Sequence, residues 1–252
     1  RPMDRNQLIA KLRELPAARR IITALDVPGM NQALDLAERL GTRGGFVKVG
    51  LELYSAAGPE VVHRLQNLER DVFLDLKYHD IPNTVAAAAR VAATLGASLC
   101  TMHASNGRTA MTAAAEALAS APVVPRTGRR PALLAVTILT SLSEQEMGEV
   151  SPSHDSLQDR IRRLARLAWD CGCDGLVCSP TDLPGLREAL GPDPLIVTPG
   201  IRPAGAETGD QVRVATPAQA MAAGADFLVI GRPITKAPDP GAALAAIAAE
   251  LD

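Results

Sequence analysis

The densest group of charged residues lies in one twelve-residue segment, Phe73 to Thr84. Within it, Asp75 and Lys77 are two positions apart, so both side chains would point to the same face of a strand. Lys48 lies inside another apolar run and requires an acidic partner, for which Asp75 is the nearest candidate. Charges gathered in this way indicate acid–base or electrostatic catalysis, because burying them otherwise costs stability. A purely structural ion pair is the alternative interpretation.

Other polar residues stand where short apolar runs of the chain end. Asp26 ends the first run, Thr140 follows the fifth, and Arg202 follows the seventh. If these runs are the parallel strands of a barrel, their carboxyl ends share one rim, which is where barrel enzymes carry their active sites. The sequence therefore predicts that these side chains converge with Lys48 and Asp75 on one rim.

The elements that must position these residues follow from hydrophobic patterning. We predict eight strands: Ile21 to Asp26, Phe46 to Gly50, Val72 to Lys77, Ser98 to His103, Ala132 to Leu139, Gly175 to Cys178, Leu195 to Pro199 and Phe227 to Gly231. Segments between them have helical composition, for example Met30 to Leu40, Thr84 to Leu95, Arg108 to Ser120 and Asp159 to Asp170. Strands and helices therefore alternate along the chain.

Strands without polar alternation, each followed by a helix, are typical of a parallel sheet covered by helices. An open doubly wound sheet and a closed barrel both satisfy this pattern. A length of 252 residues and eight strands favour one (β/α)8 TIM barrel spanning residues 1–252, and Ala24 to Gly29 lacks the glycine pattern of dinucleotide-binding sheets. Arg1 and Pro2 are expected to be cloning remnants, and Ser141 to Ser156 is predicted to be a loop or lid.

The composition limits the class of ligand. Lys and Arg total 26 against 28 Asp and Glu, which gives a net charge of -2 and no basic field for nucleic acid or an anionic membrane surface. Aromatic residues make up only 2%, too few for base-stacking platforms, and no apolar run approaches the roughly 20 residues that span a bilayer. We expect a small polar ligand, with neither nucleic acid nor membrane as a partner.

The cysteines indicate the compartment. Cys100, Cys171, Cys173 and Cys178 are too few and too clustered for a disulfide framework, and their spacing matches neither a redox pair nor a zinc knuckle. We interpret them as reduced, packed thiols. Because the amino terminus also lacks the apolar core of a secretory signal, a cytoplasmic location is expected.

The segment Asp75-x-Lys77-x-x-Asp80-Ile-Pro-Asn-Thr84 resembles the signature of the orotidine 5'-monophosphate decarboxylase family. Six further blocks resemble that family in the same order: Ala24 to Asp26, Val47 to Gly50, Leu139 to Ser141, Thr198 to Pro203, Gly209 to Gln211 and Ile230 to Thr235. The resemblance covers nearly the whole chain. In its length, the sequence is similar to the longer bacterial form of the enzymes in that family.

This resemblance implies decarboxylation of orotidine 5'-monophosphate to uridine 5'-monophosphate, the last step of de novo pyrimidine nucleotide synthesis, without cofactor or metal. Lys48, Asp75, Lys77 and Asp80 would form an alternating array of charges, with Lys77 as proton donor. Asp80 and Thr84 would reach across a homodimer interface into the neighbouring site, so that each active site is shared by two chains.

The resemblance also implies how the nucleotide is bound. Its phosphate would be held by Gly231 and Arg232 after the eighth strand, with Arg202 and Gln211 folding over it from the long loop after the seventh. Asp26 would accept hydrogen bonds from the ribose hydroxyls, beside Lys48. Thr140 would lie near the pyrimidine edge, with Thr137 as a neighbouring alternative.

Two other functions fit parts of the sequence. A magnesium-dependent sugar-phosphate decarboxylase or aldolase of the same barrel group would share the Asp75-x-Lys77-x-x-Asp80 core, and a non-catalytic sensor of phosphoribosyl ligands would share the barrel. No cluster of His, Cys and carboxylate residues has metal-binding spacing, and we interpret His79 and His103 as structural. A requirement for metal would distinguish the magnesium-dependent enzyme from the nucleotide decarboxylase, and the absence of turnover would identify the sensor.

Overall fold

The computed structural model describes residues 2–203 and 215–251. Eight strands form one closed parallel barrel in chain order, and β8 pairs with β1 to close it. The strands are β1 Ile21–Ala24, β2 Phe46–Val49, β3 Asp71–Tyr78, β4 Leu99–His103, β5 Ala132–Val136, β6 Gly175–Val177, β7 Leu195–Thr198 and β8 Phe227–Ile230. The predicted barrel and all eight predicted strands are confirmed, although β5 ends three residues before Leu139.

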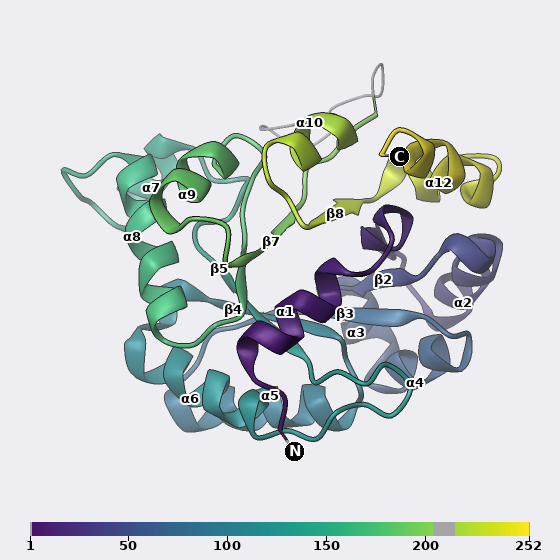
Figure 1. The fold of residues 1–252 in the computed structure, drawn as a ribbon, viewed down its shortest axis with the longest axis horizontal. Coiled ribbons are helices and arrows are strands. Elements are labelled where there is room, and N and C mark those ends of the chain that lie inside the picture. Colours follow the sequence, from purple (N-terminus) through teal and green to yellow (C-terminus); the bar gives the residue numbers. More distant parts are fainter. Residues whose placement is uncertain (1, 204–214, 252) are drawn as a thin grey trace.

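Helices surround the barrel (Figure 1). They are α1 Arg5–Arg13, α2 Met30–Arg39, α3 Leu51–Ala57, α4 Glu60–Asn67, α5 Pro82–Thr94, α6 Arg108–Ala119, α7 Glu144–Val150, α8 Leu157–Asp170, α9 Leu183–Leu190, α10 Pro217–Ala222, α11 Arg232–Thr235 and α12 Pro240–Ala249. Short 3-10 helices occur at η1 Ala17–Arg20, η2 Gly41–Arg43 and η3 Ala104–Asn106. The four helices predicted from composition are α2, α5, α6 and α8, each within two residues of its predicted ends.

The side chains of the strands divide between two hydrophobic cores. Those facing outward pack under the helices, while those facing inward fill the barrel, where Phe46 and Phe227 meet edge to face with ring centroids 5.2 Å apart. Helix α1 lies across one end of the barrel and buries Leu8 and Leu12 in the inner core (Figure 1). This end is therefore closed, and the opposite end is left for a ligand.

The closed end is fixed by buried aspartates at the amino-terminal ends of three strands. Asp174, before β6, accepts two hydrogen bonds from the Arg130 guanidinium at 2.8 and 2.9 Å and a third from the backbone N–H of Leu133. Asp71 and Asp226 are paired with arginines in the same way at β3 and β8. Each of these three buried carboxylates has cationic partners, which offset the cost of burying its charge. We therefore assign them a structural role.

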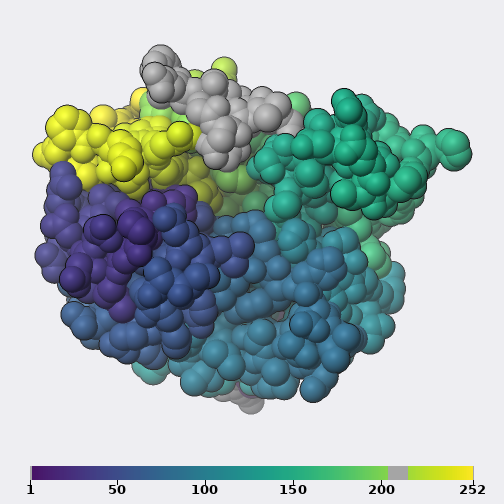
Figure 2. All heavy atoms as spheres, turned by 180° about the vertical axis from the view of Figure 1, so that it is seen from behind, coloured from purple at the N-terminus to yellow at the C-terminus, as the bar shows by residue number. Residues whose placement is uncertain are grey.

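Residues Ser141 to Ser156 were predicted to be a loop or lid, but α7 occupies the middle of this segment. The helix begins with a capping box, in which the Ser143 hydroxyl accepts from the backbone N–H of Glu146 and the Glu146 carboxylate accepts from the N–H of Ser143. The surrounding teal-green part of the chain projects from the edge of the molecule in both views (Figures 1 and 2). Figure 2 also shows the yellow carboxy-terminal part of the chain against the purple amino-terminal part, in agreement with the contacts of α12 with η1 and α2.

Candidate active site

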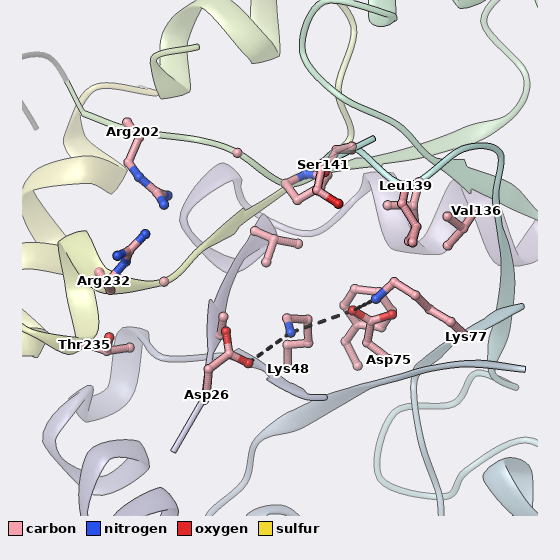
Figure 3. Close-up of a pocket in the computed structure, with 18 of the residues that line it drawn as sticks. Asp26, Lys48, Asp75, Lys77, Val136, Leu139, Ser141, Arg202, Arg232 and Thr235 are labelled. Atoms are coloured by element: carbon pink, nitrogen blue, oxygen red, sulfur yellow. Dashed lines mark hydrogen bonds and ion pairs between the residues drawn. The ribbon is translucent and has the colours of Figure 1, made fainter. Parts of the chain in front are cut away.

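A cavity of about 550 Å³ opens at the carboxyl ends of the strands. Its lining residues come from β1, β2, β3, β5, β6 and β8 and from segments that follow the strands, including the one after β7 (Figure 3). The sequence-predicted residues that line it are Asp26, Lys48, Asp75, Lys77, Thr140, Arg202, Gly231 and Arg232. The barrel therefore brings together residues that are more than 200 positions apart in the chain, as the predicted convergence on one rim requires.

Four of these side chains form a continuous row of alternating charge (Figure 3). The Lys77 Nζ atom lies 2.9 Å from Oδ2 of Asp75, and the Lys48 Nζ atom lies 3.7 Å from the same oxygen. Lys48 also donates to Oδ1 of Asp26 at 3.2 Å. The pairing of Lys48 with Asp75, expected from the position of a lysine in an apolar run, is present.

Asp75 is the buried centre of this row, since only 11% of its side chain is exposed. Burial by itself raises the pKa of Asp75, but Lys77, Lys48 and hydrogen bonds from Lys77 and Thr101 outweigh it and hold the pKa below its ordinary value. Asp75 therefore remains a carboxylate, and the two ammonium groups beside it keep a charged partner.

A break in the regularity of β3 positions Lys77. The pairing of β3 with β4 shifts between Leu74 and Tyr78, and Lys77 has a φ of 50°, in the left-handed region that side chains other than glycine rarely adopt. The Lys77 backbone N–H donates to the Thr101 hydroxyl at 3.0 Å, and that hydroxyl donates to Oδ1 of Asp75 at 2.8 Å. Sequence reasoning did not single out Thr101, because a threonine inside an apolar strand carries no signal of its own.

The other end of the cavity is cationic. Arg202, from the segment after β7, and Arg232, at the start of α11, point their guanidinium groups toward each other on the side of the cavity opposite Asp75 and Lys77 (Figure 3). Thr235 and Lys236 also line the cavity and were not predicted as site residues, although Thr235 ends the block Ile230 to Thr235 that the sequence had marked and Lys236 directly follows it. Two guanidinium groups with a lysine nearby suit a phosphate group.

The structure distinguishes the two threonines that sequence reasoning left open. Thr140 lines the cavity beside Leu139 and Ser141. Thr137 is only 3% exposed and is absent from the lining, and its Oγ1 atom has no hydrogen-bond partner in the described part of the chain. Ser141 is a further lining residue that was not predicted. Gln211 lies outside the described residues.

Asp80 and Thr84 do not line this cavity; both are exposed on the outside of the barrel. The backbone of Asp80 is nevertheless held in place, because its N–H donates to Oδ1 of Asn106 at 2.8 Å and its carbonyl accepts from Asn106 Nδ2 at 2.7 Å. Lys48, Asp75 and Lys77 of the expected array thus lie together in one chain, and Asp80 lies outside the cavity. The assignment of Asp80 and Thr84 to a neighbouring site stays a prediction.

His79 and His103 form a ring pair beside the row of charges, with centroids 5.4 Å apart. Burial lowers the pKa of His103, and the neighbouring His79 and Lys77 lower it further. His103 is therefore neutral near pH 7. Within residues 2–203 and 215–251, no three His, Cys, Asp or Glu side chains are grouped as metal ligands.

Fold and site together define a (β/α)8 barrel with a cavity at the carboxyl ends of its strands, in which one end holds alternating charges and the other holds two arginines. The sequence model of the orotidine 5'-phosphate decarboxylase / HUMPS family matches residues 19–247. The chain belongs to this family.

Individual relatives agree with this assignment. The chain is 51% identical over 231 residues to the orotidine 5'-phosphate decarboxylase of Laribacter hongkongensis, covering 92% of each chain. It is 50% identical over 240 residues to that of Halorhodospira halophila, covering 94% of this chain and 98% of the other. The crystal structure of the Lactobacillus acidophilus enzyme superimposes with a TM-score of 0.82 at 39% identity, covering 92% of this chain and 98% of that one.

The helices of the described residues are short or polar for a membrane span. None of them combines the length and apolar character needed to cross a bilayer.

Proposed function

We propose that this protein converts orotidine 5'-monophosphate to uridine 5'-monophosphate by removing carbon dioxide from C6 of the pyrimidine. The observation that carries the proposal is the charge distribution of one cavity, with Asp75 between two lysines at one end and two arginines at the other. The substrate has matching features, a carboxylate on the pyrimidine and a phosphate on the ribose. Relatives about half identical to this chain carry the name of this enzyme, which supports the same assignment.

In the proposed reaction, the bond between C6 and the carboxylate breaks and its electron pair stays on C6. No neighbouring group of the pyrimidine delocalises that pair, so the protein must supply a cation close to it. The ammonium group of Lys77 stabilises the developing carbanion and then donates a proton to it, forming the C6–H bond of the product. Lys77 recovers its proton from solvent before the next turnover.

Asp75 is proposed to face the departing carboxylate and to hold Lys77 in place. Two like charges about 4 Å apart at an effective dielectric constant near 20 repel by about 4 kcal/mol. The most demanding enzymes lower barriers by about 20 kcal/mol or more, so repulsion of the substrate by Asp75 is a minor contribution. The larger share is assigned to the fixed positions of Lys48 and Lys77, which need no reorganisation during the reaction.

The remaining residues of the cavity are proposed to bind the rest of the nucleotide. Arg232, Arg202 and the backbone of Gly231 hold the phosphate, and binding energy gained there is used to order the reacting end. Asp26, whose side chain is 60% exposed beside Lys48, accepts hydrogen bonds from the ribose hydroxyls. Thr140 contacts the pyrimidine edge, and Gln211 is proposed to contact the phosphate.

We further propose that the active protein is a homodimer in which Asp80 and Thr84 complete the site of the partner chain. Asp80 is held by Asn106 outside the cavity of its own chain, and Ile81 beside it is 66% exposed. Val91, on the same helix α5 as Thr84, is 53% exposed. Exposed apolar side chains next to Asp80 and along α5 support an interface at this position.

Two broader proposals concern the chain as a whole. Residues 1–252 are proposed to fold as one barrel domain, which the closure of the sheet by β1 and β8 supports. The protein is proposed to act in the cytoplasm, because Cys100, Cys171, Cys173 and Cys178 are buried as free thiols.

A magnesium-dependent sugar-phosphate activity is the rival within this family. A divalent cation needs carboxylate oxygens that are free to coordinate it. Here Asp75 is occupied by Lys77 and Thr101, and Asp26 by Lys48. This pairing favours the nucleotide substrate, which needs cations already in the site.

The test is to add orotidine 5'-monophosphate to the purified protein in excess chelator and to follow the ultraviolet absorbance change that accompanies loss of the carboxylate. We expect rapid turnover that chelator does not affect. Binding without turnover would contradict the proposal and favour a sensor, whereas activity only on a sugar phosphate and only with magnesium would favour the rival enzyme.

A further inference from the structure

We propose that Thr101 is a positioning residue of the reaction, which sets the geometry of both Asp75 and Lys77 through one hydroxyl group. The inference rests on the proposed function only for its kinetic test. Thr101 lies in β4, is fully buried and does not line the cavity. It therefore acts on the substrate only through its two neighbours.

The direction of each hydrogen bond at Thr101 is fixed by chemistry. The Lys77 backbone N–H can only donate, so the hydroxyl oxygen accepts from it at 3.0 Å. The ionised Asp75 carboxylate can only accept, so the single hydroxyl proton points to its Oδ1 atom at 2.8 Å. The Thr101 hydroxyl therefore uses its proton for Asp75 and accepts a hydrogen bond from Lys77.

The strand pairing shows why a side chain is needed at this position. Leu74 pairs with Cys100 and Tyr78 pairs with Met102, so β3 advances four residues while β4 advances two. The extra residues of β3 lose regular ladder partners, and Thr101 is the one residue of β4 opposite them. Its hydroxyl supplies the acceptor that the Lys77 N–H lacks in the ladder.

The same bond supports an unfavourable backbone conformation. Lys77 has a φ of 50°, which a lysine keeps only where its surroundings hold it there. With Thr101 on Oδ1 and the Lys77 ammonium on Oδ2 at 2.9 Å, the Asp75 carboxylate is held at both oxygens. The position of the Lys77 ammonium and the plane of the carboxylate therefore depend on one threonine outside the cavity.

The test compares Thr101→Val, which keeps the shape but removes the hydroxyl, with Thr101→Ser, which keeps the hydroxyl. Thr23→Val is the matched control, because Thr23 is also a fully buried barrel threonine and its Oγ1 has no partner among the described residues. We expect Thr101→Val to lower kcat about 10- to 100-fold with a much smaller change in KM, as for a lost hydrogen bond to a charged group. Thr101→Ser and Thr23→Val should stay within about threefold of the wild-type kcat.

A second measurement does not depend on turnover. The carboxyl carbon of Asp75 is titrated by NMR in the wild type and both Thr101 variants. Loss of the donated hydrogen bond should raise the pKa of Asp75 in Thr101→Val and not in Thr101→Ser, and should move the acidic limb of the pH–rate profile to higher pH. The titratable groups facing Asp75 are Lys48, Lys77 and, farther away, His103, and none of them is substituted in these variants.

The inference is overturned if Thr101→Val keeps the wild-type kcat and Asp75 titration, or if Thr101→Ser is impaired as severely as Thr101→Val. The second result would mean that Thr101 contributes packing only. If Thr101→Val does not fold, Thr101→Ala takes its place in the same comparison. A wild-type protein without decarboxylase activity would contradict the proposed function, while the NMR titration would still decide whether Thr101 controls Asp75.

Discussion

Lys77 and Asp75 are joined within one strand, with Nζ of Lys77 2.9 Å from Oδ2 of Asp75. Side chains two positions apart on a regular strand point the same way but start about 6.6 Å apart along it. The left-handed conformation at Lys77 and the register shift of β3 depart from that regular spacing where the two groups meet. The contact between the two charged groups therefore belongs to an irregular strand end.

Lys77→Ala should reduce kcat by at least about 1,000-fold, because it removes both the proton donor and the cation next to the developing carbanion. The fold should persist, since the Lys77 side chain is only partly buried. Steady-state kinetics and circular dichroism check this. Lys11→Ala on α1, at the closed end of the barrel, is the control and should keep wild-type activity. Substantial turnover by Lys77→Ala would remove this lysine from the proton-transfer step.

Arg232→Ala should weaken substrate binding far more than Lys77→Ala does. Losing a hydrogen-bonded guanidinium partner of a phosphate corresponds to roughly a tenfold to hundredfold rise in KM or Kd. The dissociation constant of the product nucleotide, measured by calorimetry, separates binding from chemistry. Arg64→Ala, on the exposed face of α4, serves as the charge-matched control. An unchanged KM would exclude Arg232 from the phosphate site.

Mixing two inactive variants tests the shared site. Lys77→Ala and Asp80→Ala chains should each be inactive as homodimers, but a heterodimer would contain one site with both residues intact. After complete subunit exchange, half the dimers are mixed, so activity should recover to about a quarter of the wild-type level. Mixing two separately tagged Lys77→Ala chains should recover none. Mass spectrometry verifies that the subunits have exchanged. If activity does not recover after that, the shared site is contradicted.

Asp174→Ala should destabilise the barrel by about 3–5 kcal/mol, because Arg130 would remain buried without its partner carboxylate. Urea unfolding measures this loss. Asp35→Ala is the matched control, since Asp35 pairs with Arg39 on the exposed surface of α2 at 3.8 Å and should change stability by less than about 1 kcal/mol. The folded fraction of Asp174→Ala should keep its kcat, because Asp174 lies at the closed end. A loss below 1 kcal/mol would mean that the buried pair contributes little to stability.

Much of the fold and part of the site could be predicted from local patterns. Apolar runs gave the eight strands, and the period of two along a strand placed Asp75 and Lys77 on one face. The helix α7 was missed, although the Ser143-x-x-Glu146 capping box was visible in the sequence. The end of β5 at Val136 was also missed, because apolar character continues to Leu139 and pattern alone does not mark where pairing stops.

By itself, the sequence determined the order of strands and helices, the closure into a barrel by length and count, and the charged residues that gather at the carboxyl ends. These features depend on local periodicity and on composition, which a linear chain already contains. Only the tertiary structure decided that Thr101 bonds both Asp75 and Lys77, that Thr140 rather than Thr137 lines the cavity, and that Asp80 faces outward. Each of these depends on the register between neighbouring strands and on the exact end of a strand, where a shift of one residue turns a side chain to the opposite face.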